Sequence, residues 1–388
     1  MDFQLSDEQR MLQDSARRFL ADHCAFEDRP ALIGAGSFDL SRWQQFAEQG
    51  WLGMGIAEDY DGLGGTPIET ALLMEEMGRV LFVEPFWAVA VLAAQTIAAA
   101  DDAAHARALL PLIASGEGRP VLAHNEVRAR GVIEFVATTA RAAAGGWRLS
   151  GQKSLVIGGN AADRFIVSAR TGGGGEADRQ GISLFIVPRD TPGLVVRDFR
   201  LIDNRWCADL DLRDVAVGEA DLLGRLDHGF AALDTGHAHA LIGLCAEALG
   251  VMERALWVTR DYLKTRKQFG VTLNTFQALQ HRMSEMLIEL ELTRGMVHRG
   301  LASMSLPAEE RARALSATKI HVGRSGKFVC GQAIQLHGGI GVAEEYLIGH
   351  HFKRMTTIES ALGTSHMHLE HLAEHERRVA DDLGMISG

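Results

Sequence analysis

The run Gln335-Leu336-His337-Gly338-Gly339-Ile340-Gly341 decides the fold class, together with two motifs that stand at helix ends on either side of it. A long helical pattern ends at its glycine pair, and glycine both terminates helices and lets a ligand approach the backbone closely. Upstream, Arg266-Lys267-Gln268-Phe269-Gly270 ends another long helical pattern. Downstream, Gly363-Thr364-Ser365 opens a third. The last part of the chain therefore reads as long helices whose ends carry ligand-binding residue types.

The helical patterns of this last part are long enough for a bundle. Amphipathic spacing extends over four segments: Phe230 to Lys264, Phe276 to Met304, Ala308 to Leu336, and about Ser365 to Leu383. Antiparallel helices of this length, joined by short loops, form four-helix bundles. We predict such a bundle over residues 224–388.

The first third of the chain is predicted to be helical as well. Ser6 and Gln9 have the spacing of a capping box, and apolar residues then recur at helical intervals. The same periodicity continues through Trp43 to Gly50, Ile68 to Val80, Phe86 to Ala100 and Ala103 to Ala114. We expect an N-terminal α-helical domain over residues 1–119.

Between these helical parts the pattern changes to short runs rich in β-branched and aromatic residues. The predicted strands are Val132 to Ala140, Trp147 to Ser150, Arg164 to Ala169, Ile182 to Pro188, Leu194 to Phe199 and Ala208 to Leu212. No long helix separates them, as a parallel sheet would require. Residues 120–223 therefore predict a middle β-barrel or sandwich, and the whole chain an α+β multidomain fold.

Composition narrows the functional classes. The 388 residues suffice for two or three packed units, and 47% apolar with 23% charged residues is ordinary for a soluble globular protein. A net charge of -11 argues against a nucleic-acid surface. The four cysteines show no CxxC spacing, the N-terminus has no signal-peptide pattern, and Phe86 to Ala100 is too short to span a bilayer. We expect a cytoplasmic protein that is not inserted in a membrane.

The order and spacing of the three motifs, with Tyr346 and Arg354 between the last two, resemble the acyl-CoA dehydrogenase family. The stretch from Glu58 through Arg79 also resembles that family's N-terminal domain, so the resemblance covers essentially the whole chain. It implies FAD as cofactor and α,β-dehydrogenation of an acyl-CoA thioester. It further implies an electron-transfer flavoprotein as electron acceptor and a homo- or hetero-oligomer, either a dimer or a dimer of dimers.

The resemblance assigns the cofactor residues. Arg266, Phe269, Gln335, Gly338 and Gly339 would clamp the ADP half of an FAD held by the dimer mate. An arginine fork suits a diphosphate, and a phenylalanine ring offers a face to a nucleoside.

Other cofactor contacts are expected on both sides of the flavin. Thr364 resembles the family threonine that contacts the diphosphate from the subunit holding the flavin ring. Asn125 is the polar residue left where a flavin-binding threonine is expected, and Leu155-Val156-Ile157 replaces the family's Trp-Ile-Thr. The full set of further expected contacts is Gln268, Phe276, Thr364, His366, Asn125, Leu155 and Ile157.

The catalytic half of the pattern is altered. The family usually places a glutamate before Gly-Thr-Ser to remove the substrate's α-proton, and here that residue is Leu362. Members with the base on the first bundle helix carry it at the position of Ala240, and a frequent arginine next to it is here Leu241. The family's Gly-Ala-Gly-Ser-Asp loop is replaced by 128–132, Arg-Ala-Arg-Gly-Val. Losses at so many functional positions favour a change of role.

Two carboxylates could replace the missing base. Glu247 lies two turns beyond Ala240 on the same helix face, and Glu359 lies one turn before Leu362. The simpler expectation for both is a solvated or salt-bridged surface acid.

The four histidines His366, His368, His371 and His375 invite a zinc interpretation. Their surroundings predict instead an amphipathic helix with exposed histidines, so no metal is expected.

The favoured hypothesis is an FAD-clamping subunit of a heteromeric acyl-CoA dehydrogenase whose partner chain supplies the base. The alternatives are a self-sufficient dehydrogenase using Glu247 or Glu359, a flavin monooxygenase, and a structural or regulatory protein on a flavin-binding fold.

Overall fold

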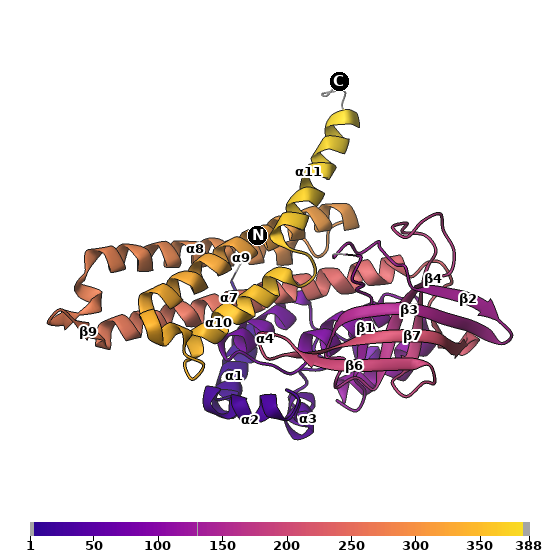
Figure 1. The fold of residues 1–388 in the computed structure, drawn as a ribbon, viewed down its shortest axis with the longest axis horizontal. Coiled ribbons are helices and arrows are strands. Elements are labelled where there is room, and N and C mark those ends of the chain that lie inside the picture. Colours follow the sequence, from indigo (N-terminus) through magenta and orange to yellow (C-terminus); the bar gives the residue numbers. More distant parts are fainter. Residues whose placement is uncertain (1–3, 130, 383–388) are drawn as a thin grey trace. The chain divides into compact units, whose positions relative to one another are not determined.

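A computed structural model describes residues 4–129 and 131–382 of the chain (Figure 1). Arg130 and the last residue of the predicted C-terminal helix, Leu383, lie outside this part, as do the first three residues. The chain forms two compact units. The first combines Met1–Phe26, Ala71–Phe82 and Leu241–Gly388, and the second combines Glu27–Thr70 and Val83–Ala240.

The bundle predicted for the C-terminal part is confirmed. Its long helices are α7 (Phe230–Thr265), whose first residues belong to the second unit, α8 (Gln277–Ala302), α9 (Ala308–His337) and α11 (Ser365–Asp382). A fifth helix, α10 (Leu347–Ser360), was not predicted. It packs on α9 and buries Ile348, Met355 and Ile358. Polar residues are buried on the same helix, namely His350, His351, Arg354 and Glu359, so its apolar pattern is interrupted.

Two N-terminal helices complete the first unit: α1 (Asp7–His23) and the main part of α4 (Pro67–Arg79). The predicted capping box of α1 is present. The Gln9 amide N–H donates to Ser6 Oγ at 3.1 Å, and the Ser6 N–H donates to Gln9 Oε1 at 3.0 Å.

The second unit contains short helices beside the sheet. They are α2 (Arg29–Gly34), α3 (Leu40–Glu48), α5 (Ala94–Ala98) and α6 (Ala103–Ala114). The apolar run predicted as one buried helix is buried and helical, but Trp87–Ala93 is wound as a π-helix that continues into α5. Across the described residues, no helix combines the length and apolar character that a membrane crossing requires.

The middle domain is a single eight-stranded sheet (Figure 1). Its strands are β1 (Pro120–Ala123), β2 (Thr139–Ala143), β3 (Gly146–Ile157), β4 (Arg164–Arg170), β5 (Ile182–Pro188), β6 (Leu194–Arg200), β7 (Trp206–Gly218) and β8 (Leu222–Leu223). Pairing follows the order β6-β7-β3-β2-β4-β5-β8, with β1 parallel to β4. The predicted order of helical domain, sheet domain and helical bundle is confirmed.

One predicted strand is largely wrong. Of Val132 to Ala140 only the last two residues belong to a strand, β2. The backbone just before β2 forms hydrogen bonds with side chains instead of with a neighbouring strand. The Glu126 carboxylate accepts the N–H groups of Ala137 and Thr138, and the Arg170 guanidinium donates to the carbonyls of Glu134 and Val136. Such side-chain partners satisfy backbone groups as fully as a neighbouring strand does.

Candidate functional site

The predicted ADP clamp begins with a tight hairpin after α7. Strands β9 (Lys267–Gln268) and β10 (Val271–Thr272) are joined by Phe269 and Gly270, with φ 55° and 84°. A two-residue hairpin loop with both φ values positive suits the twist of the strands, which explains the glycine. Phe269 pays a conformational cost for this position, and its side chain is 90% exposed.

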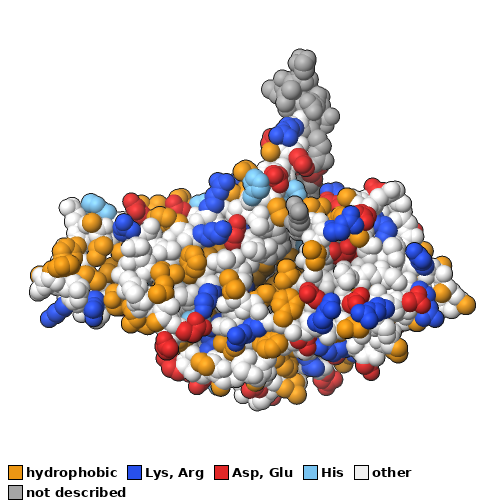
Figure 2. Space-filling view, in the orientation of Figure 1, with side chains coloured by type: hydrophobic (Ala, Val, Ile, Leu, Met, Phe, Trp, Pro, Cys, Tyr) orange, Lys and Arg blue, Asp and Glu red, His pale blue; other side chains and the backbone are white. Residues whose placement is uncertain are grey.

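The side chains around this hairpin are available for a ligand. The Phe269 ring stands edge-on to the Phe276 ring, with centroids 6.2 Å apart. Arg266 is exposed, and no hydrogen bond or ion pair joins its side chain to another part of the described chain. Gln268 is exposed and turns its amide back to the Lys267 carbonyl at 2.8 Å. Figure 2 shows apolar side chains gathered at the end of the bundle where Figure 1 labels β9.

The second part of the clamp lies at the end of α9. The Tyr262 ring stacks on His337 at 4.4 Å between centroids, and its hydroxyl donates to the His337 carbonyl at 3.3 Å. This contact brings the C-terminal ends of α7 and α9 together. Gly338 follows directly, and a Cβ placed on it or on Gly339 would meet no atom within 4 Å.

These residues fit the ADP half of FAD. One end of the bundle carries the exposed cation Arg266, which has no partner among the described residues, and the exposed ring of Phe269. The same end carries the exposed Gln335 amide and the two open glycines, Gly338 and Gly339. An arginine fork pairs with phosphate oxygens, and a bare glycine backbone allows close approach of a nucleotide.

The turn between α10 and α11 carries Leu362, the residue at which the resemblance of the motifs predicts the usual base. Leu362 is half-buried and adopts φ 54°, and Gly363 follows with φ 97°. The next residue, Thr364, accepts the Met367 N–H on its hydroxyl oxygen at 3.3 Å. Because a leucine side chain has no lone pair, this position cannot take a proton.

Glu247 is not the surface acid that was expected. It is 2% exposed and forms two hydrogen bonds with Arg354, which is 3% exposed: Nε to Oε1 at 2.7 Å and Nη2 to Oε2 at 2.5 Å. Both carboxylate oxygens are therefore occupied by a buried guanidinium.

Glu359 is also buried, at 8% exposure, instead of lying on the surface. Its Oε1 accepts the Ser365 N–H at 3.1 Å, and its Oε2 accepts the Ser365 hydroxyl at 2.8 Å. Lys327 lies 3.8 Å away. Glu359 thus caps the start of α11.

The expectation of exposed histidines on α11 is only partly right. His366 is exposed, whereas His368 is buried between Ser316 and the Leu362 carbonyl. The described residues contain no group of three or more His, Cys, Asp or Glu side chains arranged to hold a metal ion.

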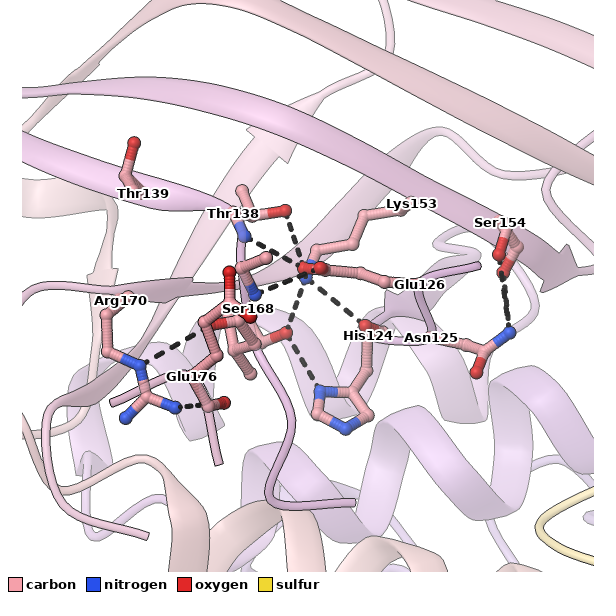
Figure 3. Close-up of polar contacts among 12 residues, drawn as sticks. His124, Asn125, Glu126, Thr138, Thr139, Lys153, Ser154, Ser168, Arg170 and Glu176 are labelled. Carbon is pink, nitrogen blue, oxygen red and sulfur yellow. Dashed lines mark hydrogen bonds and ion pairs between the residues drawn. The ribbon is translucent and has the colours of Figure 1, made fainter. Parts of the chain in front are cut away.

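In the second unit, Asn125 is positioned by a buried polar cluster (Figure 3). The Lys153 ammonium donates to Glu126 Oε1 at 2.7 Å, to Ser168 Oγ at 3.0 Å and to the His124 carbonyl at 3.2 Å. Burial lowers the pKa of Lys153 to about 8. Burial alone would raise the pKa of Glu126, but the Lys153 charge holds it below its ordinary value.

The sequence alone does not indicate the pairing of Glu126 with Lys153 or the contacts of His124 and Ser168. A buried lysine facing a glutamate is signalled by nothing local. The cluster fixes the chain on both sides of Asn125, whose amide donates to the Ser154 carbonyl at 3.3 Å.

Leu155 and Ile157 follow on β3, where the register with β7 shifts between Lys153 and Val156. Leu155 adopts φ 53°, is 49% exposed and donates its N–H to Asp209 Oδ1 at 3.1 Å. Ile157 is half-buried opposite Cys207. The side chains at both positions are hydrocarbon, so only backbone groups could bond a flavin there.

Three models of one family match the chain in series. The N-terminal, middle and C-terminal domains of acyl-CoA dehydrogenase match residues 6–117, 131–215 and 227–376. The chain belongs to the acyl-CoA dehydrogenase family. Members are flavoprotein oxidoreductases acting on CH–CH groups, and their FAD supplies hydride acceptance when bound. The predicted family, fold and cofactor are thereby confirmed.

Individual relatives cover nearly the whole chain of this family member. A probable acyl-CoA dehydrogenase of Bacillus subtilis, YngJ, is 30% identical, with 94% of this chain and 97% of the relative aligned. The 3-sulfinopropanoyl-CoA desulfinase of Paraburkholderia xenovorans is 30% identical over 88% and 89%. The solved Tcur3481-Tcur3483 steroid ACAD is 31% identical, with a TM-score of 0.86 and coverage of 97% and 99%.

Proposed function

We propose that this chain is the FAD-clamping subunit of a heteromeric acyl-CoA dehydrogenase, in which a partner chain supplies the base that removes the α-proton. One contrast supports the proposal. The residues suited to the ADP half of FAD are present and open, whereas both positions that carry the base in the family, Leu362 and Ala240, are hydrocarbon.

The two alternative carboxylates are engaged elsewhere. A general base needs an accessible lone pair at the substrate proton. Glu247 gives both oxygens to Arg354, and separating a buried pair leaves an uncompensated charge in the interior. Glu359 gives both oxygens to Ser365. These contacts weigh against a self-sufficient dehydrogenase that uses either acid.

Other features support the finer parts of the proposal. The name of the steroid ACAD neighbour joins two designations, Tcur3481 and Tcur3483, which favours assembly from two chains. The names of both relatives refer to a CoA thioester, which favours an acyl-CoA substrate. The resemblance of the motifs supports an electron-transfer flavoprotein as electron acceptor and a dimer or dimer of dimers as the assembly.

A reaction without an α-proton base is the second candidate. The desulfinase is a relative named for chemistry other than dehydrogenation. A flavin monooxygenase or a non-catalytic role would equally explain hydrocarbon at residue 362.

The test is anaerobic reduction of the flavin. We expect the protein purified alone, and loaded with FAD, to bleach with simple acyl-CoA thioesters about 10²–10⁴-fold more slowly than ordinary members, because the base is missing. The absorbance of oxidised flavin measures this directly.

Rapid bleaching of the purified chain would contradict the proposal. If Glu247→Gln or Glu359→Gln then abolished bleaching in a folded, yellow variant, the self-sufficient alternative would be right. The Glu291→Gln variant, which changes an exposed acid on α8, serves as the matched control.

A further inference from the structure

One face of α9 lies against the turn that joins α10 to α11. Ser316, Lys319 and Gly323 follow each other at intervals of three and four residues, so they share a helix face. Each of them contacts the turn or a residue that holds it.

Lys319 holds the end of α10. Its side chain is fully buried, and its ammonium donates to the carbonyls of Ile358 and of Ala361, the latter at 2.8 Å. The last carbonyls of a helix have no partner inside the helix and carry its negative dipole end. Burying an ammonium costs free energy unless hydrogen bonds compensate for the lost water. Lys319 therefore stabilises the backbone geometry that brings these carbonyls to it.

His368 holds the next carbonyl. Its Nε2 lies 3.0 Å from the Leu362 oxygen and its Nδ1 3.0 Å from Ser316 Oγ. Since a carbonyl only accepts, Nε2 carries the proton, and Nδ1 accepts the Ser316 hydroxyl hydrogen. Burial lowers the pKa of His368 to about 4, which keeps this neutral form at pH 7.

Gly323 makes room for the third contact. A Cβ at Gly323 would collide with the Glu359 carboxylate and the Ser365 hydroxyl, which bond to each other where the turn meets α9. Lys319, His368 and Glu359 thus hold the turn from residue 358 to residue 365.

This support matches the conformation of the turn. Leu362 and Gly363 are consecutive left-handed residues, and a Cβ on Gly363 would lie 2.9 Å from His368 Nε2. A left-handed leucine persists only where its surroundings over-determine it. After Gly363 the turn contains two side chains that can bond a ligand, Thr364 and Ser365, and Ser365 is engaged by Glu359.

We propose that Lys319, His368 and Ser316 are positioning residues that hold the turn so that the Thr364 hydroxyl is presented to the diphosphate of the flavin cofactor. The Thr364 oxygen accepts the Met367 N–H, which leaves its hydrogen free to donate to a phosphate oxygen. This inference rests on the proposed cofactor role, and it adds residues that act through Thr364 without touching the cofactor.

The test is a double-mutant cycle on the dissociation constant of FAD, measured by titrating the full-length apoprotein and following flavin fluorescence. We expect Thr364→Val and Lys319→Met each to raise Kd about tenfold or more, as for loss of a hydrogen bond to a charged group. The double variant should bind FAD as tightly as the single variant with the larger loss of affinity, because both changes act through one contact. Thr364→Ser should retain wild-type affinity.

A matched control is available on the same face of α9. Lys327→Met removes a lysine that is 52% exposed and only 3.8 Å from Glu359, and should change Kd less than twofold. If Lys319→Met fails to fold, Ser316→Ala tests the same chain of contacts through His368.

The possible failures are distinguishable. Unchanged affinity in Thr364→Val, or an unmutated chain that binds no FAD, counts against the proposed cofactor role itself. If Thr364→Val weakens FAD binding but Lys319→Met and Ser316→Ala leave it unchanged, only the positioning role is overturned. The positioning role is also overturned if the rise in Kd of the double variant equals the product of the two single rises. That result would mean that Lys319→Met weakens FAD binding independently of Thr364.

Discussion

Three candidate site residues, Leu155, Phe269 and Leu362, adopt φ values of 53°, 55° and 54°. For bulky side chains this left-handed conformation costs about 1–3 kcal/mol and persists where surrounding contacts impose it. Each residue has such contacts: Asp209 on the Leu155 N–H, a two-residue hairpin around Phe269, and His368 on the Leu362 carbonyl. Backbone geometry at these positions is therefore specified by their neighbours.

At the scale of single residues, Arg266→Ala should weaken FAD binding without unfolding the protein. The exposed guanidinium bonds to no other described residue, so its loss removes about 1.5–3 kcal/mol of ligand binding and little stability. Flavin occupancy of the purified variant measures the first effect, and thermal melting the second. Lys264→Ala, an exposed change near the same end of α7, is the control. Undiminished occupancy in Arg266→Ala would show that this residue does not hold the cofactor.

A glutamate at residue 362 should not restore catalysis. Leu362 is half-buried, and the resemblance of the motifs implies that Ile157, Gly131 and Leu241 also replace functional residues of the family. A carboxylate among apolar side chains has a raised pKa and costs stability. We expect Leu362→Glu to melt at a lower temperature and to gain no acyl-CoA-dependent flavin reduction. Leu362→Met controls for the change of shape, and a gain in flavin reduction would return the chain to the ordinary dehydrogenases.

At the scale of elements, charged side chains join four helices of the first unit. Arg17 on α1 pairs with Glu76 on α4 at 2.8 Å, and Arg79 on α4 pairs with Glu253 on α7 at 2.7 Å. Arg294 on α8 also reaches Glu253, at 3.0 Å. Two arginines from different helices therefore converge on one carboxylate.

Glu253 should make the protein sensitive to acid. Burial alone would raise its pKa, but the bonds and charges of Arg79 and Arg294 lower it from 4.5 to about 2. A depressed carboxyl pKa stabilises the fold above the unfolded value, and that stability is lost as pH falls from about 4.5 to about 2. The difference corresponds to about 3 kcal/mol.

Urea unfolding of Glu253→Gln should therefore show a lower free energy of unfolding at pH 7, and its deficit against the unmutated protein should shrink below pH about 4.5. Glu291→Gln, an exposed acid beside the same Arg294, should show little deficit at either pH. A deficit for Glu253→Gln that stays constant with pH would mean that packing, and not charge, stabilises this position.

At the scale of the whole molecule, the order of helical, sheet and bundle domains follows from periodicity that each segment carries locally. The helices α7, α8 and α9 were predicted to within a few residues, because each presents an apolar face over many turns. The strand predicted from Val132 failed because Glu126 and Arg170 bond that backbone from other parts of the chain. The short helix α10 was missed because it buries His351, Arg354 and Glu359 beside its apolar residues, which obscures the apolar face.

The sequence by itself determined the family and the cofactor, since these depend on which residue stands at each place in a motif, and the same comparison of motifs is the basis for expecting no base at Leu362. Only the tertiary structure decided what the remaining acids do. Glu247 meets Arg354 across 107 positions of the chain, and Lys153 meets Glu126 across 27. A carboxylate's chemistry depends on which charges and donors surround it and on how much water reaches it, and folding sets both by bringing together residues that the sequence keeps apart.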